Sequence, residues 1–397
     1  MQRHSNFRLL VVRLGAMGDI LHALPAVTAL RQAHPDWLID WVVEPRWRAL
    51  LAAEPFEDSL DSSSQPCQDT NGRSGFQPRQ PMLQNERGAL APKLNGKRTP
   101  AQPLIDHLHF APTKFWRKAP LSRQTRDEFL VLRTALRGGE YDAVIDLQGA
   151  IRSAIVARLA GCPRVIGESE PRERIARRLF TELVNTHGAH VIEQDIELAS
   201  AIAGDALKPV KPQLPIDSAA ELWSDEILSP TSRQPVVLIN PGAGWGAKCW
   251  PAERYAAVAQ GLIARGCRIL INAGPGEEPL AELIVRTTRG AATTLTCSLA
   301  QLIALSRRIS LAIAGDTGPL HLACALGRPV VGIYGPTDPS RNGPFGTKFI
   351  VLRSPQSRRD HTRRQAPEAG LLTIQPGDVL RAAEALLYPE SVTESVQ

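Results

Sequence analysis

AGDTGPLHLACALGRPVVGIYGPTDP, residues 314–339, reads as a strand, a tight turn, a helix and a second strand. The first strand ends at Gly315, and the next three residues form the turn. Pro319 is a favourable first-turn residue for a helix, which we predict to run from there to Gly327. A β-branched run at 329–335 follows directly, and this strand–helix–strand order is typical of α/β folds.

The same stretch has the features of a ligand site. The helix that begins near Pro319 presents free N–H groups and the positive end of its dipole at the carboxyl end of a strand. Such a position suits a phosphate group. The alternative is a well-capped helix, with Asp316 as N-cap and His321 as an ordinary residue of an inner turn. This stretch alone leaves both interpretations open.

Apolar runs alternate with amphipathic stretches through most of the chain, which predicts parallel sheets covered by helices on both faces. Eight short β-branched runs are predicted strands: residues 8–15, 38–44, 141–149, 164–167, 235–242, 267–274, 311–316 and 329–335. Residues 24–34 are a predicted helix. The predicted fold class is therefore α/β, with two halves that share a Rossmann-like plan.

Changes in composition mark the domain boundaries. Residues 206–234 concentrate proline and serine, so we interpret them as a linker between an N-terminal domain, 1–205, and a C-terminal domain, 235–390. Residues 61–103 are polar, rich in Gly and Pro and aperiodic, and we expect a disordered insertion there. A chain of 397 residues is long enough for two such domains.

The overall composition restricts the class of protein. The formal charge of +6 favours an anionic partner: nucleic acid, a phosphorylated metabolite or a membrane surface. No apolar run reaches the ~18 residues of a membrane span, and no signal peptide is evident. The six cysteines form no C-x-x-C pair and no metal-ligand spacing. We therefore expect ordinary reduced cysteines in a cytoplasmic protein and no disulfide bonds. The sequence contains no D-x-D pair and no His/Cys cluster, so we expect neither a metal nor a cofactor.

Two further strand ends in the second half have ligand-binding features. INPGAGWGAKCWP, residues 239–251, gives a glycine-rich loop beside Lys248, a mobile cation suited to a diphosphate. The loop does not match the G-x-x-x-x-G-K-[ST] motif, and an ordinary surface lysine is the alternative. INAGPGEEPLAEL, residues 271–283, places Glu277 and Glu278 where an acid commonly binds ribose, although both also suit the first turn of a helix. Three such strand ends in one half predict a nucleotide site.

The N-terminal half carries an acid at a similar turn. VVRLGAMGDILHALPAV, residues 11–27, reads as a buried strand, a glycine turn and a helix with Asp19 in its first turn. Asp19 either caps that helix, which is worth roughly 0.5–2 kcal/mol, or takes a proton as a general base if the second half delivers an electrophile to it. The turn contains no G-x-G-x-x-G motif, so a dinucleotide-dependent dehydrogenase is not favoured.

A cluster of basic and aromatic residues follows in the same half. PTKFWRKAP, residues 112–120, places Lys114, Arg117 and Lys118 beside two aromatic side chains. Such clusters occur at nucleic-acid sites, membrane interfaces and anionic sugar-lipid sites, and also on ordinary solvated surfaces. No nucleic-acid motif accompanies this one, so no nucleic-acid partner is expected.

Six segments, taken in order, resemble the bacterial ADP-heptose:lipopolysaccharide heptosyltransferases of glycosyltransferase family 9. They are RLGAMGDILHALPAVTAL (13–30), DWVVE (40–44), FWRKAP (115–120), YDAVIDLQG (141–149), KCWP (248–251) and residues 314–339. DWVVE and WRKAP are most similar to heptosyltransferase I, which adds the first heptose to Kdo-lipid A. The resemblance covers about residues 1–60 and 105–385, and the insertion at 61–103 is foreign to the family pattern.

The resemblance implies a GT-B fold, in which two Rossmann-like doubly wound domains face an interdomain cleft. It also implies an inverting, metal-independent transfer of heptose from ADP-heptose to Kdo-lipid A at the cytoplasmic face of the inner membrane. By resemblance, Asp19 is the general base and Lys248 stabilises the ADP leaving group. The other residues implied for donor binding are Ala243, Gly244, Glu278, Asp316, Thr317, Gly318 and His321. The residues implied for acceptor binding are Gly18, Lys114, Arg117 and Lys118.

The sequence departs from the family pattern in the glycine-rich loop at 239–251. The family has hydroxylated residues at the positions of Ala243 and Gly244, so backbone amides must replace those side-chain contacts here. The first alternative is a family member that acts on a later core acceptor, such as heptosyltransferase II. The second is a nucleotide-binding module without catalysis.

Overall fold

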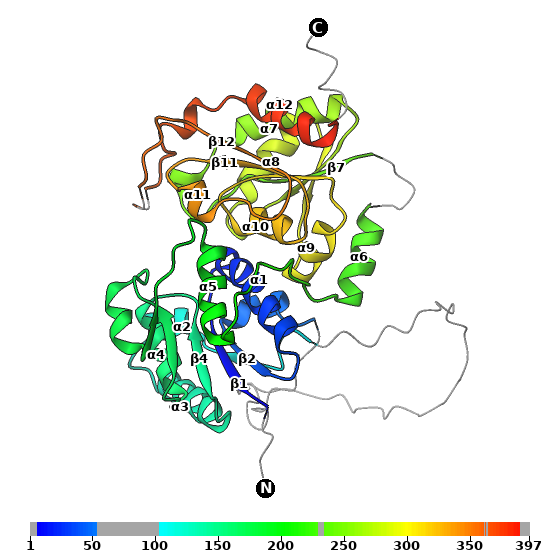
Figure 1. Ribbon diagram of the computed structural model, residues 1–397. Coiled ribbons are helices and arrows are strands. Elements are labelled where there is room, and N and C mark those ends of the chain that lie inside the picture. Colours follow the sequence, from blue (N-terminus) through cyan, green and yellow to red (C-terminus); the bar gives the residue numbers. More distant parts are fainter. Residues whose placement is uncertain (1–5, 54–102, 229–233, 361, 363, 390–397) are drawn as a thin grey trace, which may run out of the picture. The chain divides into compact units, whose positions relative to one another are not determined.

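The computed structural model describes residues 6–53, 103–228, 234–360, 362 and 364–389 (Figure 1). All of these except residue 103 belong to one compact unit. The predicted insertion, apart from its last residue, lies outside the described residues, and its disorder stays a prediction. Two six-stranded parallel sheets form the framework of the compact unit, which confirms the predicted α/β class.

The first sheet has the order β3-β2-β1-β4-β5-β6, and all neighbouring strands are parallel. This half runs β1 (Arg8–Val12), α1 (Met17–Ala33), β2 (Leu38–Val43), η1 (Pro45–Leu50), β3 (His107–Phe110), α2 (Thr113–Lys118), α3 (Arg123–Gly138), β4 (Ala143–Asp146), α4 (Ile151–Leu159), β5 (Val165–Glu168), η2 (Arg174–Leu179), β6 (Glu182–Val184) and α5 (Val191–Ala203). Alternate residues of β1 belong to different cores: Leu9 packs with α1 and α5, and Leu10 packs with α3 and α4. Both faces of the sheet are therefore covered.

The second sheet has the order β12-β11-β10-β7-β8-β9, again all parallel. This half runs α6 (Ser218–Leu228), β7 (Val236–Asn240), η3 (Gly246–Lys248), α7 (Ala252–Ala264), β8 (Arg268–Asn272), α8 (Glu278–Thr287), β9 (Ala292–Leu295), α9 (Leu299–Ser306), β10 (Leu311–Gly315), α10 (Gly318–Ala325), β11 (Val330–Tyr334), α11 (Pro339–Asn342), β12 (Phe349–Arg353), η4 (Leu371–Thr373) and α12 (Pro376–Leu387). Val237 of β7 packs with α7 and α12, whereas Leu238 packs with α9 and α10.

The eight predicted strands are the four central strands of each sheet, β2-β1-β4-β5 and β11-β10-β7-β8. The predicted strands are confirmed, although the observed strands are up to five residues shorter than the runs predicted from the sequence. The strands that the pattern missed, β3, β6, β9 and β12, are the sheet edges. Edge strands are only partly buried, and β3 (HLHF), β6 (ELV) and β9 (ATTL) lack a continuous apolar run, so these three of the four give little signal.

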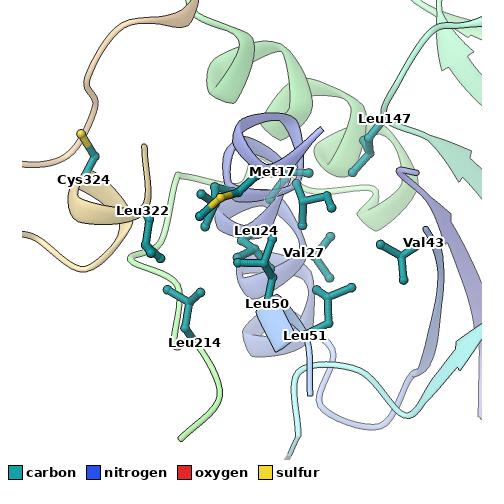
Figure 2. Close-up of a cluster of buried hydrophobic side chains, with 14 of the residues drawn as sticks. Met17, Leu24, Val27, Val43, Leu50, Leu51, Leu147, Leu214, Leu322 and Cys324 are labelled. Carbon is teal, nitrogen blue, oxygen red and sulfur yellow. The ribbon is translucent and has the colours of Figure 1, made fainter. Parts of the chain in front are cut away.

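Helix α1 is buried on all sides. Thirteen of its 17 residues are buried, and its apolar residues surround the helix instead of forming one stripe. Figure 2 shows Met17 and Leu24 of α1 beside Leu322 of α10 and Leu214, which belong to the same apolar cluster. Helix α1 is therefore packed against both halves of the compact unit.

The predicted linker at 206–234 contains an ordered helix, α6. This helix packs against α9 of the second half. Glu221 of α6 accepts a hydrogen bond from Arg307 at 2.6 Å and also pairs with Arg308. Proline and serine mark the segments around the helix, so composition alone did not reveal that its middle packs on the second half. The domain boundaries stay a prediction.

Candidate active site

The predicted site turns lie where the strand order reverses. In the first sheet the chain moves outward from β1 to β2 and β3, then returns to β4 on the other side of β1. In the second sheet β7 and β10 hold the corresponding positions. The Asp19 turn follows β1, and the loops with Lys248 and Asp316 follow β7 and β10. Open α/β sheets bind ligands at such switch points, beyond the carboxyl ends of the strands.

Lys248 and Asp316 form a buried ion pair between two loops of the second half. The Nζ of Lys248 lies 2.5 Å from Oδ2 of Asp316, and the side chains are only 12% and 8% exposed. Nε2 of His321 donates to the other carboxylate oxygen at 3.1 Å. Burial alone would raise the pKa of Asp316, but the bond from His321 and the charge of Lys248 hold it well below its usual value. Asp316 is therefore an ionised carboxylate between a cation and an imidazole.

This geometry decides two interpretations that the sequence left open. Lys248 is not an ordinary surface lysine, because Asp316 and the ring of Trp245, 4.3 Å from the ammonium, confine it. The capped-helix alternative for Asp316 is wrong, because Thr317 is the N-cap of α10. The helix begins at Gly318, and its first-turn N–H groups have no partner within the helix.

The glycine loop after β7 is tight at one point and open at another. A Cβ atom on Gly242 would overlap the carboxylate of Glu277, so a larger residue there would have to displace that side chain. A Cβ atom on Gly244 would meet no described atom within 4 Å, and Gly244 is exposed while Ala243 is half-buried. The backbone at these two residues is therefore accessible, as contact through backbone amides would require.

Glu277 is the acid that lies against this loop. Its Oε2 accepts a hydrogen bond from the N–H of Gly274 at 2.8 Å, and its carboxylate contacts Gly242. Glu278 is exposed at the first position of α8. The sequence pattern contained both acids, but only the tertiary structure shows which of them faces β7. Ribose binding by Glu278 stays a prediction.

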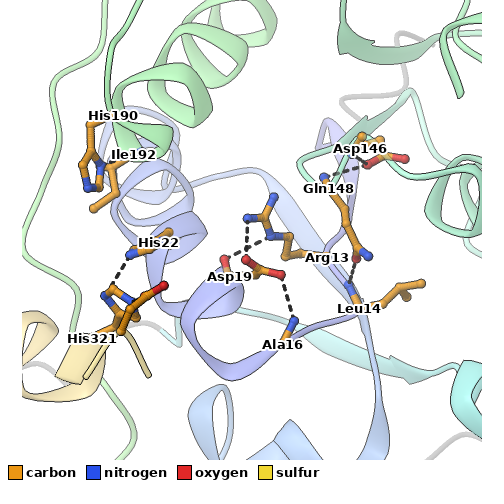
Figure 3. A network of polar contacts seen from close by, with 12 residues as sticks. Arg13, Leu14, Ala16, Asp19, His22, Asp146, Gln148, His190, Ile192 and His321 are labelled. Carbon is orange, nitrogen blue, oxygen red and sulfur yellow. Dashed lines mark hydrogen bonds and ion pairs between the residues drawn. The ribbon is translucent and has the colours of Figure 1, made fainter. Parts of the chain in front are cut away.

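Asp19 combines a capping role with partial exposure. Its Oδ2 accepts a hydrogen bond from the N–H of Ala16 at 2.9 Å, which confirms that it caps α1. Nε of Arg13 donates to the carbonyl of Asp19 at 3.0 Å, and Nη2 lies 3.8 Å from Oδ1, so the carboxylate turns toward Arg13 (Figure 3). The side chain keeps 35% of its surface exposed. Capping and proton transfer are therefore compatible at this residue.

Buried polar residues that the sequence pattern did not single out surround this turn. Oε1 of Gln148 accepts a hydrogen bond from the N–H of Leu14 at 2.8 Å, and Oδ1 of Asp146 accepts one from the N–H of Gln148 (Figure 3). Burial raises the pKa of Asp146 to about 6 and that of Asp195 to about 7, although the charge of Arg13 acts in the opposite direction. They come from β4 and α5, so no local pattern connects them to the turn.

The first turns of α1 and α10 touch each other. A Cβ atom on Gly18 would lie 2.8 Å from Cδ2 of His321, and one on Gly318 would lie 2.6 Å from Sδ of Met17. An alanine at either position would force the side chain opposite it to shift. The fold therefore brings the Asp19 turn against the helix that begins at the predicted phosphate site, although none of the described hydrogen bonds or ion pairs joins that carboxylate to the second half.

The predicted basic cluster forms helix α2 at the same edge of the first sheet. Lys114, Arg117 and Lys118 are all exposed. Oγ1 of Thr113 donates to Glu44 at 2.6 Å, which fixes α2 beside the carboxyl end of β2. Partial burial, together with the positive charges around it, lowers the pKa of Lys114. Three cations thus lie at the edge that also carries the Asp19 turn.

A cavity of about 250 Å³ lies beside the contact between α1 and α10. Its lining includes His22, His321, Phe345 and residues 209–212. Both halves and the predicted linker contribute to the lining, so the two halves enclose space next to the predicted site.

Metal-ligating side chains and long apolar helices both bear on the class of protein. Within the described residues, no group of three or more His, Cys, Asp or Glu side chains could hold a metal ion. No helix in the same part of the chain has the length and apolar character needed to cross a membrane.

Comparison with known proteins identifies a matching family. The sequence model described as glycosyltransferase family 9 (heptosyltransferase) matches residues 129–371. Lipopolysaccharide heptosyltransferase 1 of Escherichia coli K12 is 28% identical over 364 residues, which is 90% of this chain and 97% of that protein. Lipopolysaccharide heptosyltransferase 2 of the same strain is 29% identical over 64% of this chain and 78% of that protein.

Solved structures of this family have the same fold. Escherichia coli heptosyltransferase WaaC with ADP superposes with a TM-score of 0.70 at 24% identity and covers 96% of this chain and all of that one. The same enzyme with ADP-2-deoxy-2-fluoro heptose gives a TM-score of 0.67 at 25% identity, over 95% of this chain and 99% of that one. Together with the two parallel sheets, these matches confirm the GT-B fold with two Rossmann-like domains.

Proposed function

Because this chain belongs to glycosyltransferase family 9 and is a glycosyltransferase, we propose that it performs the heptosyltransferase I reaction of lipopolysaccharide inner-core biosynthesis. In this reaction L-glycero-D-manno-heptose moves from ADP-heptose to the Kdo of Kdo-lipid A. The type 1 and type 2 relatives have similar identities, but the type 1 relative matches a larger share of both chains, which supports type I. Heptosyltransferase II, or another family member acting on a later core acceptor, is the alternative.

The observation that carries this proposal is the contact between the first turns of α1 and α10. Gly18 lies against His321, and Met17 lies against Gly318. This contact brings an acid-bearing turn of the first half to the loops of the second half that hold Lys248. A transferase that joins two substrates needs such a meeting of its acceptor and donor sites.

The donor site is assigned to the loops after β7 and β10. The related enzyme whose solved structures contain ADP and a fluorinated ADP-heptose supports an ADP-sugar donor. Lys248, the N-cap residue Thr317 and the first-turn N–H groups of α10, including that of Gly318, would bind the diphosphate. Asp316 and His321 would line the heptose, and the open backbone at 243–244 would contact the nucleotide.

The chemistry is a single inverting displacement. Asp19 takes the proton of the acceptor hydroxyl, whose oxygen attacks the anomeric carbon while the bond to the ADP oxygen breaks. Negative charge grows on the leaving diphosphate, and Lys248 together with the α10 N-terminus stabilises it. Lys248 must leave Asp316 to do this, and Asp316 then keeps the hydrogen bond from His321. The reaction is proposed to need no metal and no cofactor.

The acceptor is assigned to the first half. Gly18 and the exposed cations of α2, Lys114, Arg117 and Lys118, lie at the carboxyl edge of the first sheet, where the phosphates and acidic Kdo of the acceptor would bind. No nucleic-acid partner is proposed, because the basic residues accompany no nucleic-acid motif.

Peripheral attachment to the cytoplasmic face of the inner membrane is the proposed localisation. Exposed apolar side chains lie among exposed arginines on this half: Leu121, before α3, is 98% exposed, and Ile175 of η2 is 60% exposed. Arg174, Arg177 and Arg178 surround Ile175 in the sequence and are all exposed. Apolar side chains flanked by cations fit an anionic lipid surface. Sedimentation with phosphatidylglycerol vesicles but not with phosphatidylcholine vesicles would support this localisation.

Asp19→Asn tests the proposed base. Asparagine keeps an oxygen that accepts the Ala16 N–H, so the cap survives, but it cannot take a proton. Turnover should fall by about 10²–10⁴, while the affinity for ADP, measured by calorimetry, should change little. Asp378→Asn is the matched control, because Asp378 caps α12 through the same contact, to the N–H of Gln375 at 3.0 Å. An Asp19→Asn variant with near-parental turnover would remove Asp19 from the reaction.

A product analysis separates the alternatives. The parental enzyme is incubated with ADP-heptose and either Kdo-lipid A or an acceptor that already carries one heptose, and the products are weighed by mass spectrometry. Gain of one heptose on Kdo-lipid A supports type I, and gain only on the heptosylated acceptor supports type II. Binding of ADP without any product would support a binding module.

A further inference from the structure

A continuous hydrogen-bonded chain runs from helix α1 of the first half to Lys248 of the second. Nε2 of His22 lies 3.2 Å from Nδ1 of His321, Nε2 of His321 lies 3.1 Å from Oδ1 of Asp316, and Oδ2 of Asp316 lies 2.5 Å from Nζ of Lys248. His22 and His321 are each only 6% exposed. Figure 3 shows the two imidazoles pointing toward each other from separate helices.

The direction of the protons in this chain follows from Asp316. Asp316 is ionised and can only accept, so Nε2 of His321 must carry the proton of their bond. Burial, reinforced by the neighbouring histidines, holds the pKa of His22 well below its usual value, so its ring is neutral. Whichever of the two imidazoles donates in the bond between them, that bond fixes the ring of His321 with its Nε2–H toward Asp316.

The third buried histidine, His190, stays outside the chain. Its ring centroid lies 5.5 Å from that of His22, which is an edge contact between rings. Its Nε2 lies 3.1 Å from the carbonyl of Gly343, and its Nδ1 accepts a hydrogen bond from the N–H of Ile192. Both nitrogens of His190 therefore have other partners, and His22 is the residue that holds His321.

Under the proposed function, the partners of Asp316 change when the donor binds. Without the donor, both Lys248 and His321 compensate the charge of Asp316. Under the proposed function, Lys248 moves to the diphosphate of the donor, and the bond from His321 becomes the main compensation of a buried carboxylate. A group that fixes His321 therefore stabilises the donor-bound state more than the free state.

We infer that His22 is a positioning residue for the donor site, which acts from the acceptor half by orienting His321 toward Asp316 and so allows Lys248 to leave that carboxylate for the diphosphate. His22 touches neither substrate in this scheme. The inference rests on the proposed function, because it assumes that Lys248 binds the donor.

His22→Phe tests the inference in the full chain, because phenylalanine keeps the ring and removes the hydrogen bond. The Kd for ADP and the KM for ADP-heptose should both rise about three- to tenfold, the range of one hydrogen bond, with kcat within about twofold. His22→Gln, which retains an N–H at a similar reach, should restore both constants to within about twofold. If His22→Phe does not fold, His22→Asn takes its place, since the shorter amide does not reach His321.

Thr28→Val is the matched control for burial. Thr28 lies on α1, is 6% exposed like His22, and its hydroxyl has no partner among the described residues. Its substitution should leave the Kd for ADP unchanged. An unchanged Kd for ADP in His22→Phe overturns the inference. The inference is also overturned if the Kd for ADP rises in His22→Phe, His22→Gln and Thr28→Val alike, in proportion to the thermal stability that each variant loses. The role of His22 is then structural.

Lys248→Met separates this inference from the proposed function. If Lys248→Met leaves ADP binding unchanged, the assignment of the donor site fails and the inference fails with it. If Lys248→Met weakens ADP binding and His22→Phe does not, only the inference about His22 fails.

Discussion

Removal of Lys248 should destabilise the fold as well as slow the reaction. At the observed separation of 2.5 Å, the attraction between Lys248 and Asp316 is about 7 kcal/mol at an effective dielectric constant of about 20, and desolvation of the two ions cancels several kcal/mol of it. Loss of one partner of a buried pair usually costs ~3–5 kcal/mol. Asp316 keeps the bond from His321, so we expect Lys248→Met to lower the free energy of unfolding by about 3 kcal/mol.

A double-mutant cycle isolates the pair. Asp316→Asn should lower the free energy of unfolding by less than Lys248→Met does, because the Lys248 ammonium that loses its partner can move toward solvent. In the double variant no charge is buried alone, so its free energy of unfolding should return to within about 1 kcal/mol of the parent. The affinity for ADP should not return, because the cation that binds the diphosphate is still absent. Recovery of stability without recovery of binding separates the two roles of Lys248.

Urea unfolding followed by circular dichroism at several pH values measures the cycle. The pKa of Asp316 is lowered in the folded state, so its stabilisation is complete above its unfolded value of 3.8 and is lost as pH falls toward the folded value. The difference between parent and Lys248→Met should therefore be full at pH 7 and shrink below about pH 4. A cost below about 1 kcal/mol at pH 7, or a double variant no more stable than Lys248→Met, would refute the reasoning.

Three further predictions concern other parts of the molecule. Burial raises the pKa of Asp195 to about 7, so folding takes up a proton there. Asp195→Asn should therefore increase the free energy of unfolding, measured with urea, more at pH 8 than at pH 5. An equal increase at both pH values would contradict this. Gly318→Ala should lower the free energy of unfolding by about 1–3 kcal/mol, because the added methyl group clashes with Met17. Adding Met17→Ala should recover part of the loss in thermal melts. If nothing is recovered, the clash is not with Met17. The KM for the acceptor should rise with ionic strength. The double variant Lys114→Gln/Arg117→Gln should weaken that dependence and leave the KM for ADP-heptose unchanged. If the dependence of the acceptor KM on ionic strength stays the same, these cations do not bind the acceptor.

The framework of the fold could be predicted from local patterns. All eight predicted strands exist, because central strands of parallel sheets are buried on both faces and require continuous apolar runs such as VVLI in β7. Edge strands such as β6 and β9 are partly exposed and carry polar residues, so the same rule does not detect them. The helix α6 inside the predicted linker was missed because proline and serine around it dominated the composition.

The site could be predicted only in part. Turns at Asp19, Lys248 and Asp316 were recognised because each follows a strong strand signal, and strand ends at switch points bind ligands. The choice of Glu277 over Glu278 as the acid beside the β7 loop came from the packing of α8.

The sequence by itself determined which strand ends carry glycine turns, acids and cations, because these depend on short runs of neighbouring residues. Only the tertiary structure decided which side chains meet: Lys248 with Asp316, and His22 with His321, which is 299 positions away. The physical reason is that burial, which lowers the pKa of His22 and confines Lys248, results from packing between distant segments, and no local pattern encodes the distance between them.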